Sequence, residues 1–88
     1  MNPPAPDALL HSAFYRFAPL PDPAAAAQAL RQLAQGLHGS IVVAAEGING
    51  TVAGAPAQVQ AFEAALQADS FAAGALRGMP FKHSACDG

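Results

Sequence analysis

Two amphipathic segments, each introduced by a proline, constrain the fold of this chain more than any other feature. In the first, the Asp22 carboxylate can accept from free backbone N–H groups, and Pro23 suits the first helical position. Apolar residues then recur at helical spacing up to about Leu37, where glycines end the helix. The second segment opens near Pro56, and we expect Phe71 to pack near its end. Its apolar stripe consists of Val59, Phe62 and Leu66.

The first strand is predicted over His11–Leu20, where aromatic residues of high strand propensity cluster. Side chains alternate along a strand, so Phe14 and Arg16 point to one face and Tyr15 points to the other. We expect one of these faces to meet the helices. The face that carries Arg16 is the better candidate for solvent.

Three further strands are predicted between and after the helices. Ser40–Ala45 is a short apolar run rich in β-branched residues, which predicts a strand buried in the sheet. Asn49-Gly50 precedes the strand-like run Thr51–Ala53, and both of its residues tolerate positive φ, so it predicts a hairpin turn. The last strand is predicted over Leu76–Ser84, where Pro80 indicates an edge position.

The resulting order, β-α-β-β-α-β, is that of the ferredoxin-like (acylphosphatase-like) fold. The predicted fold class is therefore α+β, with a four-stranded antiparallel sheet and both helices on one face. At 88 residues there is room for one domain, which we place at residues 11–88 after a disordered, proline-rich tail at residues 1–10. The first and last strands should be neighbours, which would bring Arg16 close to Lys82.

Charge and cysteine content limit the functions open to this chain. The formal net charge is −2 with four Lys and Arg residues, which disfavours a stand-alone nucleic-acid-binding protein. One cysteine, Cys86, excludes an intrachain disulfide and fits a reducing compartment. The sequence shows neither a membrane-spanning apolar run nor a signal-peptide pattern. We therefore expect a cytoplasmic protein without a membrane partner.

Glu46 to Gly54, EGINGTVAG, closely resembles the hairpin in the N-terminal domain of the bacterial rhodanese-domain tRNA uridine hydroxylase family. Other matches occur in the right order. The run Phe14–Phe17 is similar to that family's first strand. The run Phe81–Asp87 is similar to its Lys-x-Ser-x-Ser-Asp segment, with Cys86 where serine is usual. The resemblance covers residues 13–87, nearly the whole chain.

The resemblance implies oxygen-dependent hydroxylation of the wobble uridine of tRNA by a longer enzyme. In that family the catalytic cysteine belongs to a rhodanese domain that follows this one, and nothing in this chain matches its cysteine loop. The resemblance therefore implies a non-catalytic N-terminal domain, inactive alone and without a cofactor. Its expected roles are tRNA docking, weak by this part alone, and packing on the rhodanese domain of the same polypeptide.

Five polar residues are candidates for contacting RNA or the following domain: Arg16, Glu46, Asn49, Thr51 and Lys82. Two of them, Arg16 and Lys82, belong to a candidate positive patch for phosphate, which Arg77 and His83 extend. The alternative is structural. The glycines of the hairpin then serve the tight turn, and the basic residues lie on a solvated strand face.

No residue pattern indicates a catalytic or metal site. Cys86 lies three residues after His83, but in a strand or loop this spacing does not fix a contact that would activate the thiol. Three scattered histidines and one cysteine do not form a metal-ligand pattern.

Other functions share this topology. An acylphosphatase needs a Gly-rich loop with an arginine after the first strand, and Pro19–Pro23 has neither. A stand-alone RNA-recognition module stacks bases on aromatic residues of its first and third strands, and Thr51–Ala53 has none. A protein-interaction module stays open, because a fold does not fix a function.

Overall fold

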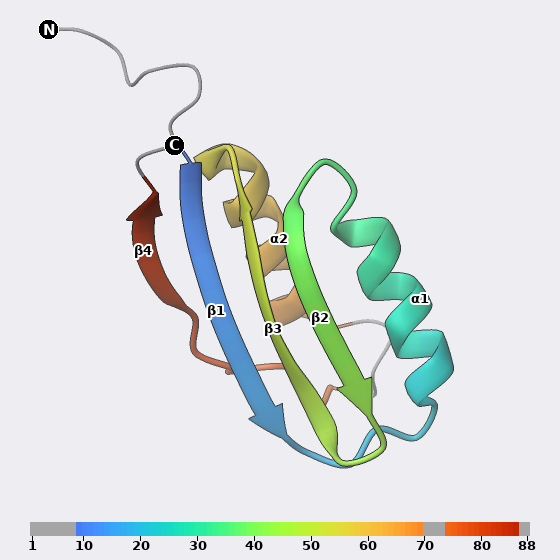
Figure 1. The fold of residues 1–88 in the computed structure, drawn as a ribbon. Helices are drawn as coiled ribbons and strands as arrows, with labels where there is room; N and C mark the ends of the chain where they lie inside the picture. Colours follow the sequence, from blue (N-terminus) through green and yellow to red (C-terminus); the bar gives the residue numbers. More distant parts are fainter. Residues whose placement is uncertain (1–8, 70–73, 87–88) are drawn as a thin grey trace, which may run out of the picture.

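The computed structural model describes residues 9–69 and 74–86, and its elements follow the β-α-β-β-α-β order predicted from the sequence (Figure 1). They are β1 (Leu9–Phe17), α1 (Pro23–Leu33), β2 (His38–Ala44), β3 (Gly47–Gly54), α2 (Pro56–Ala68) and β4 (Lys82–Cys86). The strands form one antiparallel sheet in the order β2-β3-β1-β4. The predictions that β1 and β4 are neighbours and that β4 is an edge strand are therefore confirmed.

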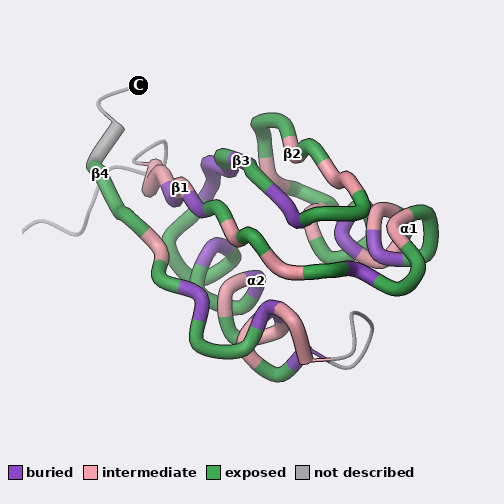
Figure 2. Tube along the Cα trace, turned by 90° about the horizontal axis from the view of Figure 1, so that it is seen from below, coloured by how far each residue is buried: buried purple, intermediate pink, exposed green. Residues whose placement is uncertain are grey.

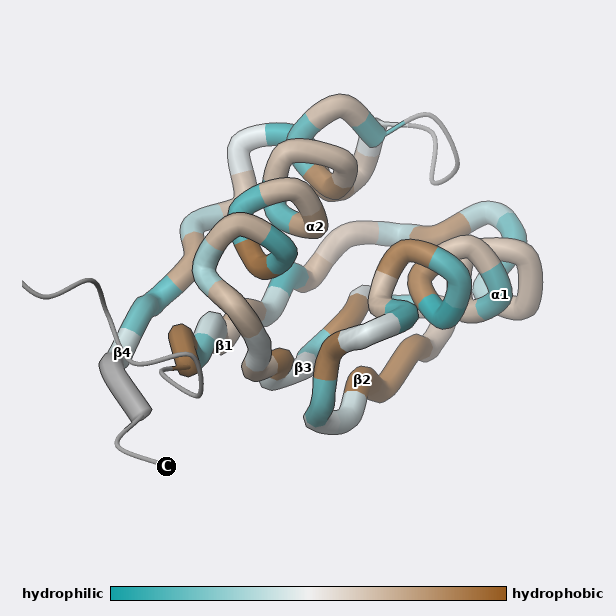
Figure 3. The backbone as a smooth tube through the Cα atoms, turned by 90° about the horizontal axis from the view of Figure 1, so that it is seen from above, coloured by the Kyte–Doolittle hydropathy of each residue, from teal (hydrophilic) through white to brown (hydrophobic). Residues whose placement is uncertain are grey.

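Both helices lie on the same side of the sheet, as predicted for a ferredoxin-like α+β fold (Figure 2). Figure 3 shows the same arrangement from the opposite end, with hydrophobic segments along β2 and β3. In the part of the chain that the structure describes, the other side of the sheet is covered by no element.

The core lies between the sheet and the helices, with Phe14 of β1 near its centre. The ring centroid of Phe14 lies 5.9 Å from that of Phe62 on α2 and 5.7 Å from that of Phe81, which precedes β4. Burying each large apolar side chain contributes about 1.5–3 kcal/mol, so these contacts hold α2 and the start of β4 against β1. The other buried core residues are Leu20, Ala26, Leu30, Ile48, Val52, Leu66, Leu76 and Met79.

Helix α1 begins as predicted and ends earlier than predicted. Asp22 Oδ1 accepts a hydrogen bond from the Ala25 N–H at 3.1 Å, which satisfies one free donor of the first turn. The helix ends at Leu33 because the chain turns away through Gly36, whose φ is 87°. Leu37 still packs against the core, but from the loop and not from the helix.

Helix α2 buries the predicted stripe of Val59, Phe62 and Leu66. It ends at Asp69, which has the left-handed φ of 34°. The Asp69 carboxylate accepts a hydrogen bond from the Leu76 N–H at 2.8 Å and so ties the end of α2 to the segment before β4. Phe71, which the sequence predicts to pack near this end, lies outside the described residues.

The hairpin between β2 and β3 is present, but the predicted position of its turn is wrong. The turn consists of Ala45 and Glu46, and Asn49-Gly50 lies inside β3. A sequence signal for a tight turn therefore marks a strand position here.

Two positions of β3 require glycine, each for a different structural reason. A Cβ on Gly50 would lie 3.0 Å from both Phe14 Cζ and Ile41 Cγ1, so this position must stay small for the core to pack. Gly47 directly follows the turn with a φ of 152°, and a Cβ there would lie 1.9 Å from the Arg16 carbonyl oxygen. The need for Gly50 comes from residues distant in sequence, and a local turn pattern does not reveal it.

Strand β2 is an edge strand, and the prediction that Ser40–Ala45 is buried within the sheet is wrong. Its apolar residues alternate: Ile41 and Val43 pack against the core, whereas Val42 points outward and is exposed. A run of β-branched residues therefore does not by itself separate an edge strand from a central one.

The last strand is shorter than predicted, because the segment before Lys82 forms turns. Gln67 Nε2 donates to the Met79 carbonyl at 2.6 Å, and its Oε1 accepts from the Gly78 N–H at 2.7 Å. These bonds hold Leu76 and Met79 in place as buried core residues. Strand β1, in turn, begins at Leu9, earlier than predicted.

Candidate functional site

The uncovered side of the sheet carries large apolar side chains. It is formed by the residues of the four strands that point away from the helices, and we call it the open face. Tyr15 and Phe17 of β1 are 68% and 82% exposed, and Val42 of β2 is 65% exposed. Phe14 directly precedes Tyr15 but is only 4% exposed, because successive side chains of β1 point to opposite faces of the sheet.

Strand register arranges the open face in rows. Val42, Asn49 and Tyr15 are partners across β2, β3 and β1, so Asn49 lies between an aliphatic and an aromatic side chain. Directly opposed side chains have Cβ atoms about 4.5–5.5 Å apart and therefore interact. The next row crosses all four strands and consists of Ser40, Thr51, Ala13 and Lys82.

Two shallow hollows flank Tyr15. One, of about 250 Å³, lies toward the hairpin turn, and its lining includes Phe17, Val42 and Glu46. The other, of about 290 Å³, lies toward β4, and its lining includes Thr51 and Lys82. Tyr15 and Asn49 line both hollows. Four of the five predicted site residues, Glu46, Asn49, Thr51 and Lys82, are thus exposed and lie around one aromatic side chain.

Arg16 borders the hollow beside Phe17, but its side chain points away from the open face, and the prediction that its face is open to solvent is wrong. It shares the helix-covered face with Phe14, because that aromatic ring is the one the core buries. Arg16 Nε donates to the Ala75 carbonyl at 3.1 Å, and a terminal nitrogen donates to the Arg77 carbonyl. Its guanidinium therefore fastens the segment before β4 to β1.

The predicted juxtaposition of Arg16 and Lys82 is also wrong. Lys82 is the register partner of Ala13, whose side chain points to the open face, whereas Arg16 points to the helix side. The two cations lie on opposite sides of the sheet. A common phosphate patch of Arg16 and Lys82 is therefore not formed.

His83 likewise points to the helix side. Its Nε2 contacts Glu63 Oε2 on α2, and the same oxygen accepts a hydrogen bond from Ser12 Oγ at 2.5 Å. Ser12 is fully buried, so one carboxylate satisfies a buried hydroxyl and anchors the edge strand β4 to α2. This cluster stabilises the packing of the sheet against α2 and does not extend the open face.

The described carboxylates lie mainly away from the open face. Asp22 caps α1, Glu63 bonds Ser12 and His83, and Asp69 ends α2. Glu46, at the hairpin turn, is the one described carboxylate that lines a hollow beside Tyr15. A negatively charged ligand on the open face would therefore meet Lys82 with little repulsion from carboxylates.

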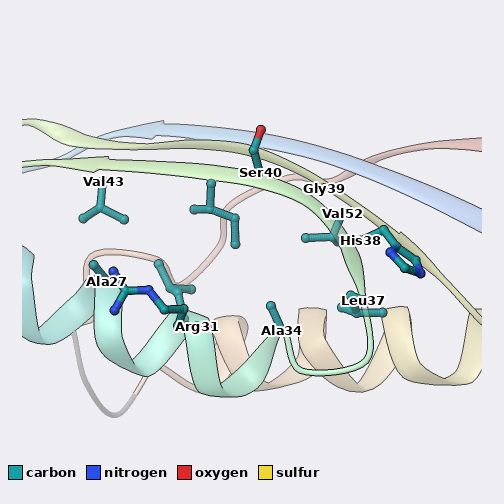
Figure 4. A pocket seen from close by; sticks show the side chains of 11 residues that line it. Ala27, Arg31, Ala34, Leu37, His38, Gly39, Ser40, Val43 and Val52 are labelled. Atoms are coloured by element: carbon teal, nitrogen blue, oxygen red, sulfur yellow. The ribbon is translucent and has the colours of Figure 1, made fainter.

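A third hollow, of about 280 Å³, separates α1 from β2, and no sequence pattern predicts it. Figure 4 shows Ala27, Arg31 and Ala34 on the helix side of this groove and Val43 and Val52 on the sheet side. The alanine-rich composition of α1 is the signal that could have indicated it, because short side chains leave space above an edge strand.

Within the described residues, no group of three or more His, Cys, Asp or Glu side chains is arranged to hold a metal ion. No helix among these residues is long and apolar enough to cross a membrane. The expectation of an ordinary thiol at Cys86 stays a prediction.

Comparison with known families identifies the fold. The family model of the UPF0176 acylphosphatase-like domain matches residues 9–88. The chain belongs to this family. The match confirms the acylphosphatase-like fold and the resemblance seen in EGINGTVAG and its flanking motifs.

Several curated relatives of this UPF0176-type domain carry the name tRNA uridine(34) hydroxylase. The protein of Nitrobacter winogradskyi is 45% identical over 75 residues, which are 83% of this chain and 29% of the relative. That of Deinococcus radiodurans is 46% identical over 70 residues, 77% of this chain and 23% of the relative. That of Bradyrhizobium diazoefficiens is 41% identical over 78 residues, which are 86% of this chain and 31% of the relative. The chain thus spans less than a third of the length of these relatives.

The acylphosphatase-like description of the UPF0176 domain concerns its fold, because the loop after β1 is not built to hold an anion. The Ala18 N–H donates to the Glu46 carbonyl and the Leu20 N–H donates to the Ala45 carbonyl, each at 2.9 Å. Pro19 and the other prolines of this loop have no N–H to offer. An anion cradle requires several free N–H groups that point at one place, and here Ala18 and Leu20 use theirs for the hairpin turn.

Proposed function

We propose that this chain is the non-catalytic N-terminal domain of a longer protein that hydroxylates uridine 34, the wobble uridine, of tRNA. The observation that supports this proposal most strongly is the 45% identity, over 83% of the chain, with a relative named tRNA uridine(34) hydroxylase. The chain corresponds to 29% of that relative, so the catalytic machinery is expected in the remaining part. We place it in a rhodanese domain of the same polypeptide.

The proposed contribution of this domain is tRNA docking, together with packing on the rhodanese domain. The open face supports it, because exposed aromatic, amide and hydroxyl groups lie beside Lys82 on one uncovered surface. With four Lys and Arg residues in the chain, binding to tRNA by this domain alone should be weak. A tRNA substrate also favours a cytoplasmic location.

The test uses the longer protein with and without residues 1–88. Each form is incubated with unmodified tRNA, and the nucleosides are quantified by mass spectrometry. Removal of the domain should weaken tRNA binding and lower formation of hydroxylated uridine at least tenfold, while the remaining part stays folded by circular dichroism. Equal affinity and equal product from both forms would refute a docking role.

A further inference from the structure

We propose that the open face is a stacking site for an unpaired nucleobase, with Tyr15 and Phe17 as the stacking surfaces and Asn49 as the group that hydrogen-bonds the base edge. The proposal rests on the proposed function, because it names the part of the tRNA that this domain holds: a single-stranded nucleotide of a loop. It also assigns a role to the two hollows beside Tyr15, which the fold alone does not require.

The aromatic side chains carry the first step of the argument. The core buries Phe14, yet its strand neighbours Tyr15 and Phe17 stand largely exposed on the open face. Residues two apart on a strand have Cα atoms about 6.8 Å apart, roughly twice the 3.4 Å separation of stacked bases. Every base has a flat π surface, so exposed aromatic rings hold single strands with little sequence preference.

Asn49 supplies the polar contact that stacking alone lacks. It is the register partner of Tyr15, it is exposed, and it lines both hollows beside that ring. Its side chain offers two N–H donors and a carbonyl acceptor, which is the combination that a base edge requires. A base stacked on Tyr15 would therefore lie within reach of an amide on the adjacent strand.

The charge distribution favours RNA as the occupant over another protein surface. Lys82 lines the hollow on the β4 side of Tyr15, and three of the four described carboxylates are bonded or placed away from the open face. The large apolar side chains that are exposed on this face are Tyr15, Phe17 and Val42. Polar side chains surround it on β3 and β4, unlike the apolar, charge-depleted centre of a protein interface.

The chain contains its own probe for this site. It has one tyrosine and no tryptophan, so its intrinsic fluorescence arises from Tyr15. The 88-residue chain is titrated with a uridine hexanucleotide and with a blunt RNA duplex at low salt, and absorption by the RNA is corrected with N-acetyl-tyrosinamide. The hexanucleotide should quench the fluorescence saturably, and the duplex should bind at least tenfold more weakly, since its bases are already stacked.

Variants test whether the aromatic rings carry the binding. By anisotropy of a labelled hexanucleotide, Tyr15→Ala and Phe17→Ala should each weaken binding about tenfold, which corresponds to about 1.4 kcal/mol. Tyr15→Phe keeps the ring and should stay within twofold of the parent chain. Leu33→Ala removes an exposed apolar side chain from α1 and is the matched control, with no expected change. Circular dichroism verifies that each variant is folded.

The proposal is overturned if the hexanucleotide causes no saturable quenching up to millimolar concentration, or if Tyr15→Ala and Phe17→Ala bind as tightly as the parent. It is also overturned if these variants leave RNA affinity unchanged but abolish self-association in sedimentation, which would assign the face to a second copy. Hexanucleotide binding that depends on Tyr15, combined with hydroxylation that does not need this domain, would retain the stacking site and refute the proposed function.

Discussion

The two sides of the sheet are made from the same strands, and β1 gives each side aromatic residues. Phe14 lies in the core against Phe62 and Phe81, whereas Tyr15 and Phe17 lie on the open face. Cations differ in the same way, because Arg16 bonds backbone carbonyls on the helix side and Lys82 is exposed on the other. Residue type alone therefore does not separate residues that hold the fold from residues available to a ligand; the side of the sheet does.

The sharpest test of this contrast pairs Phe14 with Phe17. Phe14→Ala should lower the free energy of unfolding by about 3–5 kcal/mol, since it leaves a cavity between two rings. Phe17→Ala should change it by no more than about 0.5 kcal/mol, because that ring is already in water. Urea denaturation followed by circular dichroism measures both. Similar losses from the two variants would contradict the assignment of the faces.

The cations provide the next comparison. Arg16→Ala removes the donors to the Ala75 and Arg77 carbonyls and should cost about 1.5 kcal/mol of stability, as expected for bonds from a charged group that is partly exposed. Lys82→Ala should leave stability within about 0.5 kcal/mol. The same denaturation experiment applies. A Lys82 variant less stable than the Arg16 variant would show that the roles are reversed.

The smallest expected difference involves the neighbours Ser12 and Ala13. Ser12→Ala removes the bond to Glu63 beneath the sheet and should lower stability by about 1 kcal/mol, while the carboxylate keeps its contact with His83. Ala13→Ser adds a hydroxyl on the open face and should be neutral within about 0.5 kcal/mol. Thermal unfolding of the two variants side by side resolves the difference. An Ala13 variant less stable than the Ser12 variant would contradict the roles assigned to the two positions.

Sequence reasoning succeeded where the determinant is local. The cap at Asp22 and the stripe of Val59, Phe62 and Leu66 are patterns within one segment, and both are present in the structure. The order of elements then follows, and with it the fold.

It failed where distant residues decide. Gly50 is small because Phe14 and Ile41 come close to it, and not because the chain turns there. The orientation of Arg16 depends on carbonyl groups about sixty residues later in the chain, which no strand pattern encodes. Of the candidate site, Glu46, Asn49, Thr51 and Lys82 were named from sequence, whereas Tyr15, around which they lie, was not, since alternation alone did not show which face the helices cover.

The bonds from Ala18 and Leu20 to the carbonyls of the hairpin turn have a consequence for the hollow near Phe17. They join the end of β1 to the β2–β3 turn. Two residues that line the hollow, Phe17 and Glu46, are therefore held in position relative to each other. A molecule that enters it finds the walls already in position and does not have to order a loop. The entropic cost of association would then fall mainly on the ligand, for example on a flexible single strand of RNA.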